Sequence, residues 1–126
     1  MKFLDALERA RAILLLDKQA KGLKGLVKPE KIYIGNTNYA YAFAEKNPDI
    51  GNLRETFFYS MLNVTNNVSY SDKTDFLVDG KYSFEIGGKN KGQTQIAGIT
   101  DSYIAKDDIE IGYNNQIPLW VFGLIY

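Results

Sequence analysis

The sequence contains no cysteine and no histidine. These two absences exclude zinc sites built from Cys and His, Ser-His-Asp and Cys-His catalysis, and thiol redox chemistry. Any bound metal would need oxygen ligands, which favours Mg²⁺, Mn²⁺ or Ca²⁺. No apolar run reaches the roughly 18 residues of a membrane span, and charged residues interrupt the first segment where a signal peptide would be apolar. We therefore expect a cytoplasmic protein with no membrane partner.

The phosphate-binding loops of nucleotide-dependent enzymes are missing as well. The sequence has neither a G-x-x-x-x-G-K-[ST] motif nor a G-x-G-x-x-G motif between a strand and a helix. Both motifs hold phosphates on a glycine-rich backbone. We therefore predict no nucleotide-binding residues, no ATP site and no ATPase activity.

Charge is balanced overall but unevenly distributed. The 126 residues carry 15 basic and 15 acidic side chains, of which residues 1–31 hold eight basic and four acidic ones. The first part therefore has a net charge of +4 and the remainder −4. A solvated loop is the ordinary explanation of such a basic segment, and a hairpin that contacts phosphates is the functional one. The candidate nucleic-acid-binding residues are Lys18, Lys21, Lys24 and Lys28.

Hydrophobic spacing predicts a mixture of helices and strands. Residues 2–11 have the spacing of an amphipathic helix, and residues 31–35 are β-branched and aromatic, as in a strand. Residues 12–16 are an apolar run that a buried strand would also contain. A helix is expected to start near Asn36 and to stop before Pro48, because these residues favour a cap and a break.

A second helix is expected over residues 52–63, packed on the sheet through Leu53, Phe57 and Met61. Asn52 would cap it, and Glu55 three residues later would complete a capping box. Further predicted elements are a short strand at 68–71, a short helix at 93–100, a strand at 102–105, a turn or strand at 107–113 and an apolar core segment at 117–126.

Residues 74–86 carry the clearest β-hairpin signal, with Asp79-Gly80 at the turn. A two-residue loop would mix polar and apolar side chains on each face. One additional loop residue, or a bulge, pairs Phe76 with Phe84 and gives one continuous apolar face, so we favour that register. It also places the carboxylates of Asp75 and Glu85 side by side on the other face.

Two carboxylates on adjacent strands with a lysine close behind are typical of sites that cleave phosphodiesters. The carboxylates hold a divalent metal, and the lysine stabilises the developing negative charge. The candidate catalytic residues are Asp75, Glu85 and Lys89, and the candidate ligands of Mg²⁺ or Mn²⁺ are Asp75, Glu85 and Glu55. An acidic hairpin of this kind is also common as a plain solvated surface.

Longer segments carry a resemblance to a known family. The segments KPEKIYIGNTNYAYAF, GNLRETFFYSML, DFLVDGKYSFEIGGKNK and YIAKDDIEIGYNNQIPLWVFG occur in this order. Together they resemble the C-terminal domain of unknown function that ends a family of bacterial and archaeal AAA-type ATPases. The resemblance covers residues 28–126 well and residues 1–27 more loosely. The chain would thus be a stand-alone or truncated C-terminal domain without its ATPase part.

The resemblance implies an α/β (α+β) fold. Residues 31–126 would form a restriction-endonuclease-like domain of the PD-(D/E)XK type, with a mixed sheet flanked by helices. Residues 1–30 would form a helix and basic hairpin that resemble the tail of a winged helix. The family's nuclease-like carboxylates fall on Asp75 and Glu85 and its helical acid on Glu55. Gly87 stands where an E-x-K motif needs lysine, so Lys89 would reach the site only if the strand end bulges.

Two functions remain open from the sequence. The first is a nuclease-fold domain that binds DNA and has little or no activity, which if active would be a metal-dependent DNA endonuclease. The second is a non-enzymatic domain that docks an ATPase or another protein partner. An exposed apolar patch near Trp120 and Phe122 would favour the second.

Overall fold

The computed structural model describes residues 2–18 and 28–125. Its elements are α1 (Lys2–Arg9), β1 (Ile13–Leu16), β2 (Lys31–Ile34), α2 (Thr37–Phe43), α3 (Ile50–Leu62), β3 (Val68–Ser69), β4 (Phe76–Val78), β5 (Tyr82–Gly87), the 3₁₀ turn η1 (Thr94–Ile96), β6 (Ser102–Lys106), β7 (Gln116–Pro118) and the 3₁₀ segment η2 (Leu119–Leu124). The expected mixed α and β composition is confirmed. Residues 93–100, expected as a short helix, contain only the single turn η1.

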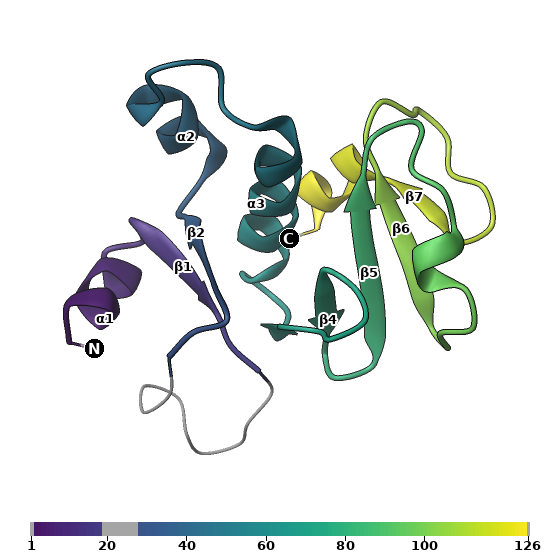
Figure 1. Ribbon diagram of the computed structural model, residues 1–126, viewed down its shortest axis with the longest axis horizontal. Helices are drawn as coiled ribbons and strands as arrows, with labels where there is room; N and C mark the ends of the chain where they lie inside the picture. The colour runs from purple at the N-terminus through teal and green to yellow at the C-terminus, as the bar shows by residue number, and fades with distance from the viewer. Residues whose placement is uncertain (1, 19–27, 126) are drawn as a thin grey trace.

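The strands form two separate sheets, and α3 lies between them (Figure 1). The larger sheet has the order β3-β4-β5-β6-β7. The first two pairings are antiparallel, whereas β5 pairs with β6 and β6 with β7 in parallel. This sheet is therefore mixed. The smaller sheet consists of β1 and β2 in antiparallel pairing.

The hairpin β4–β5 has the register that the apolar pattern favours. Phe76 pairs with Phe84 and Val78 with Tyr82, so three residues form the loop. Asp79 and Gly80 both adopt positive φ, at 53° and 67°, which is the conformation that Asp-Gly turns tolerate. The Asp79 carboxylate accepts hydrogen bonds from the Asn66 side chain and the Asn67 backbone, and these bonds lower its pKa.

The core is an aromatic stack between α3 and the larger sheet. Phe58 and Phe76 are fully buried, with ring centroids 5.2 Å apart. Phe84 lies 5.0 Å from Phe58, and Phe122 from η2 lies 4.9 Å from Phe58. Such contacts add to the large apolar area that each ring buries. The core therefore fixes the position of α3 over the centre of the sheet.

The expected start of α3 was wrong, and its expected packing is confirmed only in part. The helix begins at Ile50 and is capped by Asp49, whose carboxylate accepts the Asn52 backbone N–H at 3.0 Å. Of the predicted contacts, Leu53 is buried, Phe57 packs against the core while partly exposed, and Met61 is only partly buried. The other buried residues of the helix are Thr56, Phe58, Tyr59 and Leu62. The reason is that the smaller sheet covers a second side of the helix, which widens its buried face beyond one stripe.

The smaller sheet shares this core. Leu16 and Tyr33 are buried in the same cluster as Phe58, and the Tyr59 hydroxyl donates to the Leu15 carbonyl at 2.5 Å. The N-terminal elements thus pack directly on α3. Since β2 pairs with β1, residues 31–34 belong structurally with the N-terminal strand.

The C-terminal apolar segment is only partly core. In η2, Leu119 and Phe122 are buried, three residues apart as a 3₁₀ repeat requires, while Trp120 is 55% exposed. Within residues 2–18 and 28–125, no helix is both long and apolar enough to cross a membrane.

Candidate functional site

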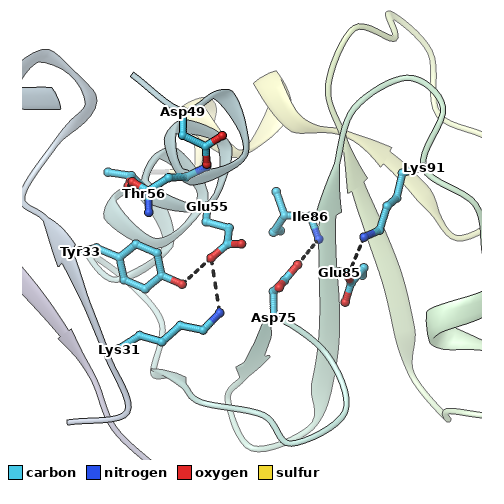
Figure 2. A network of polar contacts seen from close by, with 10 residues as sticks. Lys31, Tyr33, Asp49, Glu55, Thr56, Asp75, Glu85, Ile86 and Lys91 are labelled. Atoms are coloured by element: carbon cyan, nitrogen blue, oxygen red, sulfur yellow. Dashed lines mark hydrogen bonds and ion pairs between the residues drawn. The ribbon is translucent and has the colours of Figure 1, made fainter. Parts of the chain in front are cut away.

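Asp75 and Glu85 come from the two chains of the hairpin, and Figure 2 shows them on either side of β5, with Asp75 toward α3 and Glu85 toward Lys91. Asp75 directly precedes β4 and Glu85 lies in β5. The pairing of β4 with β5 ends at Phe76 and Phe84, the neighbours of Asp75 and Glu85. The Asp75 carboxylate accepts the Ile86 backbone N–H at 2.8 Å. Asp75 is therefore held at the backbone of β5, one residue from Glu85, and the expected side-by-side arrangement of the two carboxylates on one face stays a prediction.

The surroundings of Asp75 disfavour its charged form. Burial raises the pKa of Asp75, the Ile86 N–H opposes that rise, and the neighbouring charge of Glu85 raises it further. The ammonium groups of Lys31 and Lys91 act in the opposite direction. A cation near Asp75 would therefore favour its charged form.

Lys91, and not the predicted Lys89, forms the ion pair with Glu85. The Lys91 Nζ lies 2.8 Å from Glu85 Oε1, and the side chain of Glu85 is only 8% exposed. Lys89 is exposed and lies in the turn that follows β5. Gly87 remains paired with Lys106, so β5 ends without the bulge that would have been needed to bring Lys89 into place.

Gly87 makes room for Lys91. A Cβ atom at position 87 would lie 2.5–2.7 Å from Cβ, Cγ and Cδ of Lys91, which is too close for any real contact. The Lys91 backbone N–H donates to the Gly88 carbonyl at 3.0 Å, so the chain turns back over the strand end. The Lys91 side chain thus crosses the space that a side chain at position 87 would occupy. The glycine at position 87, where an E-x-K motif has a lysine, was the feature of the sequence that could have indicated this path of Lys91.

Glu55 is held by two residues that sequence reasoning missed. Its Oε2 accepts a hydrogen bond from the Tyr33 hydroxyl at 2.5 Å and lies 3.5 Å from Lys31 Nζ. Burial and the adjacent Glu55 raise the pKa of Tyr33 far above its ordinary value, so Tyr33 remains a hydrogen-bond donor. Lys31 and Tyr33 are two residues apart in a strand, so both lie on one face. This spacing was the feature of the sequence that could have identified them together.

Figure 2 shows Glu55 on α3 and Asp75 on the sheet projecting into the same region. In the described part of the chain, however, no three carboxylates converge as a ready ligand set. Asp75 and Glu85 remain as a pair. Mg²⁺ typically uses one or two protein carboxylates and completes its shell with water and substrate phosphate, so binding of Mg²⁺ or Mn²⁺ by Asp75 and Glu85 stays a prediction.

Two of the four candidate nucleic-acid-binding lysines lie within the described residues. Lys18 pairs with Glu30 and Asp72, each at 3.7 Å, and Lys28 is exposed. Lys21 and Lys24 lie outside the described residues. Their role in nucleic-acid binding stays a prediction.

Comparison of the chain with protein-family models, with curated proteins and with solved structures finds no match. The site must therefore be interpreted from its own geometry.

Proposed function

We propose that this domain binds the phosphodiester backbone of nucleic acid at the cluster formed by Lys31, Glu55, Asp75, Glu85 and Lys91, and that it hydrolyses the backbone with a divalent ion. The observation that carries the proposal is the Lys91 ammonium 2.8 Å from Glu85, with the Asp75 carboxylate bound to the backbone of the next residue, Ile86. This supplies the lysine that the sequence pattern lacks at position 87.

The charges of the cluster support the proposal. Glu55 is paired with Lys31 and Glu85 with Lys91, and Asp75 adds one negative charge, so these five residues have a net charge of about −1. A bound divalent ion would reverse the sign of the cluster, and a phosphodiester carries one negative charge. The cluster is therefore suited to bind first a divalent cation and then a phosphate group.

The fold supports the same interpretation at a coarser level. A mixed sheet with helices packed on it agrees with the restriction-endonuclease-like architecture that the resemblance to AAA-type ATPase C-terminal domains implies. The helix α3 supplies Glu55 and the hairpin supplies Asp75 and Glu85, as that resemblance predicts. This step rests on analogy of fold, since fold alone does not determine function.

Each side chain has a distinct role in the proposed reaction. Asp75 and Glu85 would hold the ion, which supplies positive charge and activates water. Lys91 is held in place by Glu85 and stabilises the negative charge that develops on the phosphoryl oxygens. Tyr33 and Lys31 orient Glu55, which faces the same region from α3.

The test is a cleavage assay on labelled single-stranded and duplex DNA with Mg²⁺ or Mn²⁺. We expect cleavage by the unmodified chain and its loss in Asp75→Asn, Glu85→Gln and Lys91→Met. Lys89→Met is the matched control, because it removes a lysine from the same turn without touching Glu85, and it should retain activity.

Two results would contradict the proposal. Cleavage that survives in Glu85→Gln would place the chemistry elsewhere. Loss of cleavage in Lys89→Met with full activity in Lys91→Met would show that Lys89 is the functional lysine.

A further inference from the structure

A concave site is lined by Arg54, the residue that precedes Glu55 in α3. It is a pocket of about 300 Å³ between α2, the first half of α3 and η2. This volume is at the lower end of the range for small-ligand sites. Its lining includes Tyr41, Ile50, Arg54, Phe57, Asp107 and Trp120.

Two aromatic side chains at the pocket remain largely in solvent. Trp120 is 55% exposed and Tyr41 is 61% exposed, and α2 contributes no buried residue to the core. Large rings contribute most to stability when they are buried, so their exposure here does not serve the fold. An exposed apolar patch of this kind marks an interaction site.

The charges of the pocket exclude a phosphate as its main ligand. Arg54 donates from Nε to Asp107 at 2.9 Å and from Nη2 to Asp108 at 3.3 Å. One cation is therefore offset by two carboxylates, and the guanidinium is fixed in place. A neutral, flat group with polar edges suits such a pocket, because its faces stack on rings and its edges can meet Arg54 and Asp107.

The pocket is joined to the carboxylate cluster through adjacent residues. Arg54 and Glu55 are consecutive in α3, and Arg54 faces the pocket while Glu55 faces Asp75. A Cβ atom at Gly88 would lie 2.8 Å from Arg54 Nη1, so the guanidinium rests against the turn that follows β5. The Lys91 backbone N–H donates to the Gly88 carbonyl, so Lys91 belongs to the turn that borders the pocket.

We infer that the pocket receives an unpaired nucleobase, which stacks on Trp120 and Tyr41, and that the substrate of the proposed site is single-stranded nucleic acid. This inference rests on the proposed function. In a duplex the bases are stacked and paired, so they are not free to enter a side pocket. The domain should therefore bind single strands more tightly than duplexes.

Trp120 is the only tryptophan in the sequence, so its fluorescence reports on this pocket alone. The test titrates the full chain with a 12-nucleotide single strand and with the same sequence as a duplex. Ca²⁺ replaces Mg²⁺ to limit cleavage. We expect saturable quenching by the single strand and at least tenfold weaker binding of the duplex.

The same binding is measured by anisotropy of a labelled oligonucleotide for Trp120→Ala, Tyr41→Ala and Tyr113→Ala. The first two variants should bind the single strand about tenfold more weakly, in line with the contribution of one stacked base. Tyr113, which is 74% exposed and does not line the pocket, is the matched control and should bind normally when replaced.

The outcomes separate this inference from the proposed function. Single-strand binding that persists in both pocket variants but falls in Lys91→Met would overturn the nucleobase site and leave the carboxylate site standing. Absence of binding to every oligonucleotide would overturn both. Self-association that Trp120→Ala abolishes, with no response to oligonucleotides, would show instead that the pocket contacts another copy of the chain.

Discussion

Replacing Gly87 by alanine tests the path of Lys91 over the strand end. The added Cβ would lie 2.5–2.7 Å from three atoms of the Lys91 side chain. These atoms are Cβ, Cγ and Cδ, the part of the side chain nearest the backbone, so the tip cannot simply swing aside. The whole side chain must leave, and with it the ammonium that pairs with Glu85.

The expected cost follows from the burial of Glu85. Breaking a buried ion pair by removing one partner costs about 3–5 kcal/mol, because a charge is left buried without compensation. The Glu85 side chain is 8% exposed, but the Lys91 side chain is 25% exposed, so part of the interaction is screened by water. We therefore expect a loss of about 3 kcal/mol in the free energy of unfolding, at the low end of that range.

The assay is chemical denaturation followed by circular dichroism. Gly92→Ala is the matched control, since a Cβ there meets nothing within 4 Å. In the background of Lys91→Ala, where the side chain is already truncated, Gly87→Ala should cost much less, and the coupling between the two changes should be about 2 kcal/mol or more. Equal stability of Gly87→Ala and Gly92→Ala, or strict additivity with Lys91→Ala, would refute this packing.

Three further predictions concern the core and the titrating groups. Phe84→Ala should destabilise the fold by about 3–5 kcal/mol, because it removes a buried ring from the aromatic stack, and an unchanged melting temperature would contradict the hairpin register. Tyr33→Phe should cost about 1.5–3 kcal/mol in urea unfolding, because it removes a hydrogen bond to the Glu55 carboxylate, and a neutral effect would show that the bond contributes nothing. Asp75→Asn should raise stability at pH 7. Because the pKa of Asp75 is raised, the folded chain binds this proton at a higher pH than the unfolded chain does. Asp75 therefore lowers the stability of the wild type as the pH rises from the ordinary pKa of Asp through the raised pKa. Unfolding curves from pH 4 to pH 8 should show this loss in the wild type and not in the variant.

The elements predicted from local pattern were those with a strong periodic or turn signal. The hairpin register followed from Asp79-Gly80 and from the alternation around Phe76 and Phe84. These features depend on residues close in sequence. The local sequence pattern was therefore sufficient to predict the hairpin that carries Asp75 and Glu85.

The features that sequence reasoning missed depend on contacts between distant segments. The buried face of α3 is wider than one stripe because β1 and β2 cover a second side. The hydrogen bond from Tyr33 to Glu55 joins residues that are 22 positions apart in the sequence. Neither can be read from the periodicity of one segment.

The two remaining differences arise from backbone geometry. Lys91 reaches Glu85 because the chain turns back at Gly88. The positions of the lysines in the sequence do not predict the direction of that turn. Trp120 is exposed because its apolar segment forms a 3₁₀ helix, which buries Leu119 and Phe122 and directs Trp120 outward. An apolar run alone does not show which of its residues face the core.

The most direct test of the proposed function is the effect of Mn²⁺ on unfolding of the wild type, Asp75→Asn and Glu85→Gln. An ion that binds only the folded chain stabilises it by about 2.7 kcal/mol at one hundred times the dissociation constant. We predict that Mn²⁺ raises the melting temperature of the wild type and that both variants lose most of this shift. No shift in the wild type, or an equal shift in all three proteins, would contradict a metal site at Asp75 and Glu85.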